Sequence, residues 1–293
     1  MSTSAAAVRP HKTAQEMVRS VTSIGTLPEV TSRIIATVED PKSSASQLNR
    51  LVSHDPALVT RILKIVNSAF YGVSGQIASI ERAIVLLGLN AVKNIAVAAS
   101  LGQLFRGVKL GRQFTAKDVW THCLAVGVTA RDLARRMKLP LADEAFLAGM
   151  IHDVGLLISL QTAPETLREV CETAACDPAT SFCQLEEQLI GYDHQALGMA
   201  LAEQWRFPRS CQLVAGYHHR PAELSDAEHP MLVNLIYVAD TLCCQSTHGF
   251  NLTALNQTLE PAKLESLQMN PEIVKATLEN LDQLVSSTAG LFS

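Results

Sequence analysis

The chain has 293 residues and a formal net charge of −4. Hydrophobic residues make up 47% of it, whereas aromatic residues make up only 5%. This length allows one large domain or two smaller ones around a mainly aliphatic core. The slightly acidic balance argues against a nucleic-acid partner, which would need a basic face.

The cysteines and the opening residues bear on location. There are seven cysteines with no CxxC pair, and the opening MSTSAAAVRPHKTAQEM lacks the apolar core of a signal peptide. We therefore expect reduced thiols in a cytoplasmic protein. The longest apolar region, at about 83–105, is interrupted by Asn90, Lys93 and Asn94, so no membrane partner is expected.

Helical patterns fill the first half of the chain after residues 1–12, which we expect to be disordered. The clearest begins with Asp55 as the N-cap and Pro56 at the first helical position. Gly88 is a typical helix end, and the polar, glycine-bearing stretch 106–115 indicates a boundary between two lobes. The helices predicted here cover 28–40, 46–53, 56 onward, 79–87 and 89–105.

The second half also contains helical patterns, with no convincing strand and no repeat. We predict an all-α fold in which an N-terminal helical bundle lobe, 13–110, packs on a second helical lobe, 115–247. A C-terminal helical tail, 250–293, would follow. The helices predicted here cover 116–137, 142–160, 164–175, 181–190, 194–205, 208–218 and 230–244, with a tail helix from 271 to about 285.

Several ionisable groups stand in unusually apolar surroundings. Asp153 is the only formally charged residue within 146–160, and Asp240 is the only one within 231–244. Burying an unpaired carboxylate costs several kcal/mol, in order of magnitude, and a bound metal ion would offset that cost. Imidazole together with carboxylate suits zinc, iron or manganese. The histidines in comparable settings are His122, His152, His194, His218 and His219.

Other interpretations of these groups remain open. A single buried histidine is more often a hydrogen-bonded core residue than a ligand, and only the succession of such residues on separate helices favours a metal. Asp118 lies one turn before His122 and shares its face. It also stands three residues after Thr115, where a carboxylate caps a helix. Capping is slightly the better interpretation of Asp118, and a ligand role stays open.

Two groups of motifs resemble a known family. The first half contains DPALVTRILKIVNSAFYG and AIVLLGLNAVKNI, and the second contains FLAGMIHDVGLLI, GYDHQALGMALAEQWRFP, YHHRP and YVADTL. With these motifs the chain resembles, over about 24–244, the HDOD domain, the HD-related output domain of bacterial signalling proteins. The resemblance implies an HD-type helical second lobe.

The resemblance also implies a metal site of the type H…HD…D. Matched motif by motif, its ligands are His122, His152, Asp153 and Asp240. A binuclear version, as in the cyclic-dinucleotide phosphodiesterases with an HD-GYP signature, adds histidines that match His194, His218 and His219. In such sites the aspartate of the HD pair bridges two ions, which are often iron or manganese. The resemblance therefore implies one or two divalent metal ions.

Retained ligands do not establish catalysis. Active HD-GYP enzymes commonly read HDxGK, where the lysine approaches the phosphates, and here that residue is Leu156. The GYP signature is also missing after YHHRP. Arg220 could hold a phosphate, but it is equally interpretable as a solvated surface residue or a helix cap. If the site is active, Asp153 would be its bridging catalytic carboxylate.

Two main functions remain, and we lean away from an enzyme. The favoured one is a signal-transduction module that binds a signalling protein partner, with the metal as a clamp or a sensor. The N-terminal lobe, which plain HD hydrolases lack, favours it. The alternative is a metal-dependent phosphohydrolase acting on a nucleotide or cyclic dinucleotide, which the near-complete ligand set favours. Oxygen-dependent oxidation at a di-iron site is a third, less favoured class.

Overall fold

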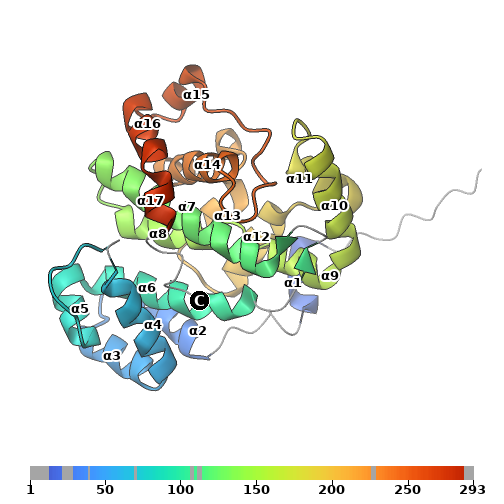
Figure 1. Cartoon of the computed structure of the whole chain (residues 1–293). Coiled ribbons are helices and arrows are strands. Elements are labelled where there is room, and N and C mark those ends of the chain that lie inside the picture. The colour runs from blue at the N-terminus through green and yellow to red at the C-terminus, as the bar shows by residue number, and fades with distance from the viewer. Residues whose placement is uncertain are drawn as a thin grey trace, which may run out of the picture.

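The computed structural model describes residues 13–21, 29–38, 40–68, 71–105, 109–110, 114–225 and 229–286. The expected disordered segment 1–12 lies outside these residues. Within them all regular secondary structure is helical apart from one pair of two-residue strands, which confirms the all-α prediction. Figure 1 shows one group of helices at the lower left and a larger group above and beside it.

The smaller group forms the N-terminal lobe. As predicted, Asp55 caps a helix, since its side chain accepts a hydrogen bond from the backbone of Leu58 at 2.9 Å. Gly88 has φ +89°, a conformation that favours glycine where two helices meet. The helices of this lobe are α2 (Glu29–Val38), α3 (Ala45–Ser53), α4 (Pro56–Val66), α5 (Ile80–Leu87) and α6 (Leu89–Leu101).

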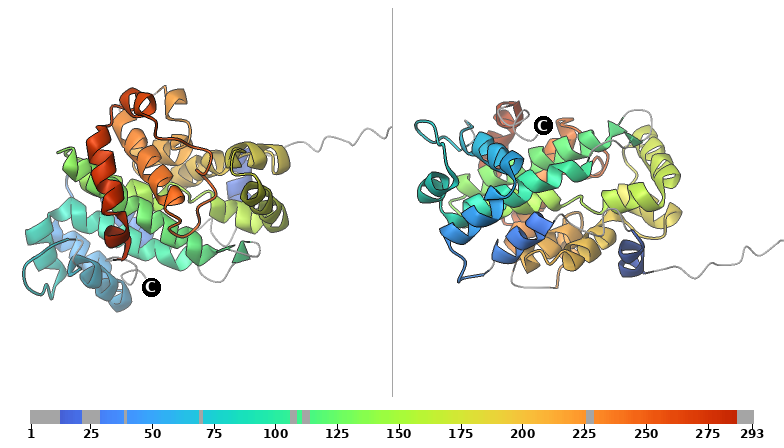
Figure 2. Two further views of the ribbon diagram at one scale, coloured as in Figure 1. Left: turned by 45° about the horizontal axis from the view of Figure 1, so that its top comes forward. Right: turned by 90° about the horizontal axis from the view of Figure 1, so that it is seen from below.

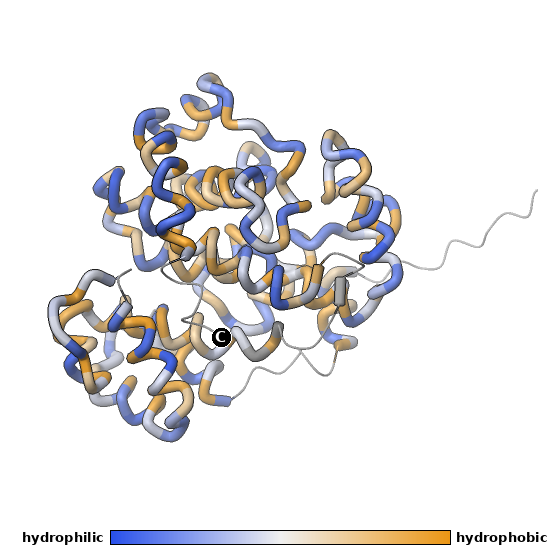
Figure 3. The backbone as a smooth tube through the Cα atoms, viewed as in Figure 1, coloured by the Kyte–Doolittle hydropathy of each residue, from blue (hydrophilic) through white to orange (hydrophobic). Residues whose placement is uncertain are grey.

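The larger lobe is built around α7, which packs on α8 and α14, while α12 packs on α13. Figure 3 shows hydrophobic segments concentrated in central helices such as α14. The elements of this lobe are α7 (Ala116–Arg136), α8 (Ala142–Ile151), α9 (Leu156–Thr162), α10 (Pro164–Cys176), α11 (Phe182–Leu189), α12 (His194–Gln204), α13 (Arg209–Tyr217), the 3₁₀ turn η2 (Pro221–Glu223) and α14 (Pro230–Gln245).

The two ends of the described chain both pack on the larger lobe. α1 (Ala14–Ser20) lies against α12 and α9 rather than beside α2, as the two views of Figure 2 also show. The tail contains α15 (Pro261–Ser266), α16 (Pro271–Glu279) and α17 (Leu281–Ser286), and its last two helices pack on α7. The predicted single tail helix is therefore interrupted between α16 and α17.

The lobes meet along α6, whose residues from Ala91 onward are buried and which packs on both α2 and α8. Polar contacts also join the two lobes. The guanidinium of Arg131 on α7 lies 4.3 Å from the centre of the Tyr71 ring and 3.2 Å from the carboxylate of Asp143. The side chain of Asn94 donates to the backbone oxygen of Asp143 at 2.9 Å. Helices α7 and α8 thus contact the N-terminal lobe directly.

The expectation of no strand was wrong at one place. After the 3₁₀ turn η1 (Gly102–Phe105), β1 (Lys109–Leu110) pairs antiparallel with β2 (Phe114–Thr115). Each strand has only two residues, which is too short to produce an alternating pattern in the sequence. The pair lies within the predicted lobe boundary.

The predicted helix over 142–160 was also wrong in one respect, because residues 152–155 form a turn that separates α8 from α9. Gly155 lies against the start of α12 so closely that a Cβ there would stand 1.9 Å from the backbone oxygen of His194. Apolar residues continue on both sides, so periodicity does not reveal the turn. The turn presents His152 and Asp153 to the interior.

The same region is the one membrane-length apolar segment found among the described residues. By length and composition, Ala142–Thr162 would suffice to cross a membrane, but 89% of its window is buried inside the protein. Burial of this kind is typical of a core element, since its apolar side chains already have protein partners.

Candidate metal centre

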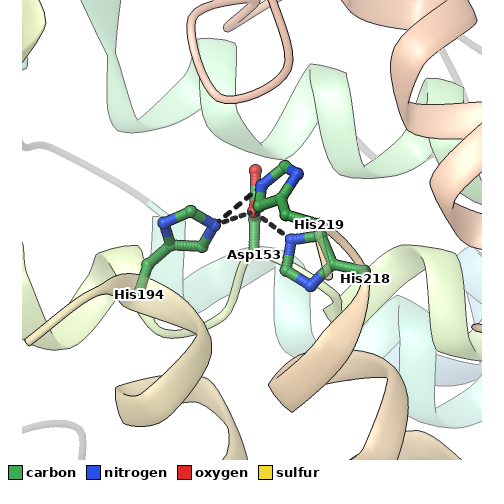
Figure 4. A group of neighbouring side chains, drawn as sticks. All are labelled: Asp153, His194, His218 and His219. Carbon is green, nitrogen blue, oxygen red and sulfur yellow. Dashed lines mark hydrogen bonds and ion pairs between the residues drawn. The ribbon is translucent and has the colours of Figure 1, made fainter. Parts of the chain in front are cut away.

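Seven ionisable side chains converge at the centre of the larger lobe. Figure 4 shows His194, His218 and His219 directed toward Asp153 from two sides. Six of the seven side chains have no exposed surface, and that of His219 is 4% exposed. Their positions are α7 for His122, the turn between α8 and α9 for His152 and Asp153, the start of α12 for His194, the end of α13 for His218 and His219, and α14 for Asp240.

One oxygen of Asp153 faces what we call the first set, His122, His152 and Asp240. Oδ2 of Asp153 lies 3.7 Å from Nε2 of His122 and 3.3 Å from Nε2 of His152. Oδ1 of Asp240 lies 3.0 Å and 3.8 Å from the same two nitrogens. The first set together with Asp153 therefore offers two imidazoles and two carboxylate oxygens around one point.

The other oxygen of Asp153 faces the second set, His194, His218 and His219, which together with Asp153 form a second group able to hold an ion. Oδ1 lies 3.3 Å from Nε2 of His194 and 3.3 Å from Nε2 of His218. Nε2 of His219 lies 3.1 Å from Nε2 of His194. Asp153 therefore stands between the two sets, with one oxygen turned to each.

The outward nitrogens of three histidines have acceptors that orient the rings. Nδ1 of His152 donates to the backbone oxygen of Gly149 at 2.7 Å, and Nδ1 of His218 donates to that of Val214 at 3.0 Å. Nδ1 of His194 donates to the carboxylate of Glu186 at 2.5 Å. These bonds hold the proton on Nδ1 and leave the Nε2 lone pair toward Asp153, as metal-binding histidines require.

Glu186 was not identified from the sequence. It lies on α11, is fully buried, and also accepts a hydrogen bond from the backbone nitrogen of His194 at 2.9 Å. Its neighbour Glu187 is partly exposed and pairs with Arg220. Adjacent glutamates in the run QLEEQL are indistinguishable by pattern, and only the helix rotation in the fold turns one of them inward.

The centre contains buried polar atoms without hydrogen-bond partners. Each such atom costs about 1–3 kcal/mol when it remains unsatisfied. Because these atoms face one another, divalent cations between them would satisfy them together, so the residues fit a metal centre. These atoms include both oxygens of Asp153, Oδ2 of Asp240, and Nε2 of His122, His152 and His218.

Burial and mutual contact shift the acidities of the group. Burial alone would raise the pKa of Asp153, but the neighbouring His152 holds it well below its usual range. Burial alone would lower the pKa of His194, but the Glu186 carboxylate raises it to about 9. Burial and the nearby His218 hold the pKa of His219 well below its usual value. The charged form of the bridging carboxylate is therefore favoured, which suits a cation site.

Asp118 lies outside both sets. Its carboxylate accepts hydrogen bonds from the backbone nitrogen of Thr115 at 2.6 Å and from the Thr115 hydroxyl at 2.7 Å. This is the capping arrangement at the start of α7, and it uses the group that a ligand role would need.

Arg220 is engaged with acidic side chains. Its guanidinium contacts the carboxylate of Asp193, lies 3.1 Å from that of Glu187 and lies 3.7 Å from that of Glu223. Asp193 is itself the N-cap of α12, immediately before His194. Arg220 thus ties the end of α13 to the start of α12.

The fold and the convergent histidines and aspartates define an all-helical protein with a metal-type centre in its second lobe. The HDOD domain model matches residues 24–221, and the chain belongs to the HDOD family. The match includes all six of the site residues before position 221, whereas Asp240 lies beyond it.

A curated relative from Treponema pallidum (strain Nichols), called an uncharacterized protein, is 25% identical over 232 residues. The match covers 79% of this chain and 44% of the relative, so the chain spans less than half the length of that relative.

Solved structures share the fold. An HDOD domain protein of unknown function from Geobacter sulfurreducens has a TM-score of 0.81 at 23% identity, covering 95% of this chain and 97% of that one. A protein from Shewanella amazonensis SB2B described as "putative phosphohydrolase" has a TM-score of 0.75 at 20% identity, covering 97% and 99%. One from Marinobacter aquaeolei VT8 described as "putative signal transduction protein" has a TM-score of 0.73 at 22% identity, covering 97% and 62%.

Proposed function

We propose that this protein is a regulatory HDOD module that holds two divalent metal ions around Asp153 and acts through a signalling protein partner. The observation that carries the proposal is the division of ligands between the two oxygens of one buried, otherwise unsatisfied carboxylate. Histidine-rich sets with carboxylate bridges suit iron or manganese. The bound ions would supply fixed positive charge at the junction of α7, α8, α12, α13 and α14.

The burial of the ligand side chains favours a regulatory role over a catalytic one. A catalytic metal needs an open position for water or substrate. Here six ligand-type side chains are fully buried and the seventh is 4% exposed. Leu156, which stands where active relatives of the HD-GYP type commonly carry a lysine, is fully buried as well. Arg220, the other candidate for holding a phosphate, already contacts three carboxylates.

The same helices that carry the ligands also contact the N-terminal lobe. α7 contributes His122 to the first set and Arg131 to the contact with Tyr71. α8 leads into the HD turn and carries Asp143 in its first turn, where its backbone oxygen contacts Asn94 of α6. Occupancy of the first set would therefore restrain elements that support the N-terminal lobe, which offers a route from metal binding to a partner surface.

A metal-dependent phosphohydrolase acting on a nucleotide or cyclic dinucleotide is the second candidate. The observation that favours it is the complete pair of ligand sets, because two ions on one carboxylate are the arrangement that activates a water for phosphoester hydrolysis. The description of the Shewanella protein points the same way.

Elemental analysis of the protein, purified without a histidine tag or added metal, tests the proposal. We expect about two equivalents of iron or manganese, and no hydrolysis when the metal-loaded protein is offered a panel of linear and cyclic nucleotides. Hydrolysis that Asp153→Ala abolishes would establish the second candidate instead. Absence of metal above background would overturn both.

A further inference from the structure

One side chain of the C-terminal tail reaches the second set. Gln257 lies in the irregular segment before α15. Its amide nitrogen is placed 2.5 Å from Nδ1 of His219 and its amide oxygen 2.8 Å from the hydroxyl of Thr241. Its backbone oxygen accepts a hydrogen bond from the side chain of Gln245 at 3.1 Å, and its backbone nitrogen donates to the backbone oxygen of Ala254 at 3.1 Å. Gln257 lies beyond the residues that the family model matches.

The hydroxyl of Thr241 decides which end of this amide faces the histidine. Thr241 is fully buried, and its single proton has the backbone oxygen of Tyr237 within 2.8 Å. With the amide oxygen of Gln257 also facing this hydroxyl, two acceptors compete for one proton. If the amide nitrogen faces it instead, Thr241 donates to Tyr237 and accepts from Gln257, and every group is satisfied. The two amide orientations have the same shape, so hydrogen bonding selects the second, in which the amide oxygen and nitrogen exchange places.

The amide oxygen then faces Nδ1 of His219, which must carry the proton. The lone pair of His219 is therefore on Nε2, directed at Nε2 of His194 at 3.1 Å. His194 also holds its proton on Nδ1, because that nitrogen donates to Glu186. A cation within reach of both Nε2 atoms would be bound by both lone pairs.

The opposite tautomer of His219 would close the second set. A proton on its Nε2 would be donated to Nε2 of His194, and both nitrogens would be lost as ligands. The contact from Gln257 therefore favours the tautomer of His219 that can bind a metal over the tautomer that hydrogen-bonds to His194.

We propose that Gln257 is a positioning residue that holds His219 in the Nδ1–H tautomer, so that its Nε2 completes the second set with His194, His218 and Asp153. This inference rests on the proposed metal centre. The tail segment is accordingly part of the centre, although it lies outside the matched family region.

The test compares three substitutions of Gln257 with a surface control in the full chain. Gln257→Leu removes the acceptor, Gln257→Asn withdraws it by one methylene, and Gln257→Glu keeps it. Gln283→Ala changes an exposed glutamine on α17 of the same tail. The readouts are Mn²⁺ equivalents and affinities by titration, and the tautomer of His219 in metal-free, ¹⁵N-labelled protein by two-bond ¹H–¹⁵N NMR.

We expect two ions in the unmodified protein, in Gln257→Glu and in Gln283→Ala. Gln257→Leu and Gln257→Asn should keep the affinity of the first ion and bind the second about 10–100-fold more weakly. The metal-free unmodified protein should show the Nδ1–H tautomer of His219, and Gln257→Leu should lose it.

Unchanged second-ion affinity in both Gln257→Leu and Gln257→Asn would overturn the inference, as would an Nε2–H tautomer in the unmodified protein. If the unmodified protein binds no metal at all, the proposed metal centre fails. The tautomer measurement then still decides whether Gln257 orients His219, so the two failures are distinguishable.

Discussion

At the scale of single residues, Asp153 is a buried carboxylate whose two oxygens both lack a hydrogen-bond partner. Four imidazole nitrogens surround its carboxylate, at 3.3 to 3.7 Å. A buried charge in this state costs several kcal/mol, in order of magnitude, unless cations compensate it. The stability of the second lobe should therefore depend on metal through this side chain.

We expect Asp153→Ala to lose both ions, because one carboxylate serves both sets. With metal at ~1,000 times its dissociation constant, binding stabilises the native state by about 4 kcal/mol. At ~3 °C per kcal/mol, chelation should lower the Tm of the unmodified protein by roughly 10 °C. Differential scanning calorimetry should show this shift, and Asp153→Ala should show none on chelation.

Asp282→Ala is the matched control, since Asp282 is exposed and its pairing with His248 at 3.0 Å should contribute little. If Asp153→Ala retained two equivalents of metal by elemental analysis, Asp153 would not be the bridge between the sets.

Glu186 should matter for the second set without touching a metal. Glu186→Gln removes the charge that makes His194 a more basic ligand but keeps the shape of the side chain. We expect the second ion to bind about 10–100-fold more weakly and the first to be unaffected. Isothermal titration with Mn²⁺ measures both affinities. Glu187→Gln is the control on the neighbouring position, and an equal loss there would argue for a general effect on α11.

The charged side chains that lie in apolar segments could be found from the sequence. The side chains that hydrogen-bond to the candidate ligands could not. Asp153 and Asp240 are conspicuous because they stand alone in apolar runs. Glu186 follows no such run, and Gln257 lies in an irregular segment without periodicity. Their roles depend on which side of α11 turns inward and on where the tail returns to the core. Both are consequences of tertiary packing rather than of local pattern.

At the scale of elements, the turn between α8 and α9 determines how the centre is assembled. It directs His152 and Asp153 inward and places Gly155 against the backbone at the start of α12, which carries His194. The helix boundaries marked by Asp55 and Gly88 were predicted because capping residues act locally. The turn at 152–155 was not, because its cause is the close approach of a helix forty residues further along the chain.

Two glycines on this contact should respond differently to a methyl group. A Cβ at Gly155 would stand 1.9 Å from the backbone oxygen of His194 and 2.6 Å from the backbone nitrogen of Gly198, so one element must move. We expect Gly155→Ala to lower the free energy of unfolding by about 3 kcal/mol and to weaken the second ion.

A Cβ at Gly198, by contrast, would meet ordinary contacts, the nearest at 3.4 Å. Because alanine favours the helix, we expect Gly198→Ala to be neutral or stabilising by up to about 1 kcal/mol. Urea denaturation of both variants measures the difference. Equal effects at the two positions would show that the contact between the turn and α12 is loose.

At the scale of the whole molecule, the same helices and side chains contact both lobes. α6 is buried between them, and Arg131 joins α7 to Tyr71 of the N-terminal lobe and to Asp143 of α8. The all-α class followed from helical periodicity, and the lobe boundary at 106–115 stays a prediction from the polar stretch there. The packing of α1 on α12 and of the tail on α7 was not predicted, because the local sequence of a short amphipathic helix does not determine which helix it packs against.

If the metal centre regulates the N-terminal lobe, removing metal should loosen the lobe contact. We expect chelation to increase amide hydrogen exchange in α7, α8 and α14 around the first set, and also in α6, because α6 packs on α8 and Asn94 bonds to Asp143. α5 packs on α3, α4 and α6 and exposes Val85, so its exchange should not change and it serves as the internal control. Hydrogen-exchange mass spectrometry of loaded and chelated protein resolves these helices. Increased exchange confined to α7, α8 and α14 would mean that the lobes are uncoupled, and a partner surface on the N-terminal lobe could not then report metal occupancy.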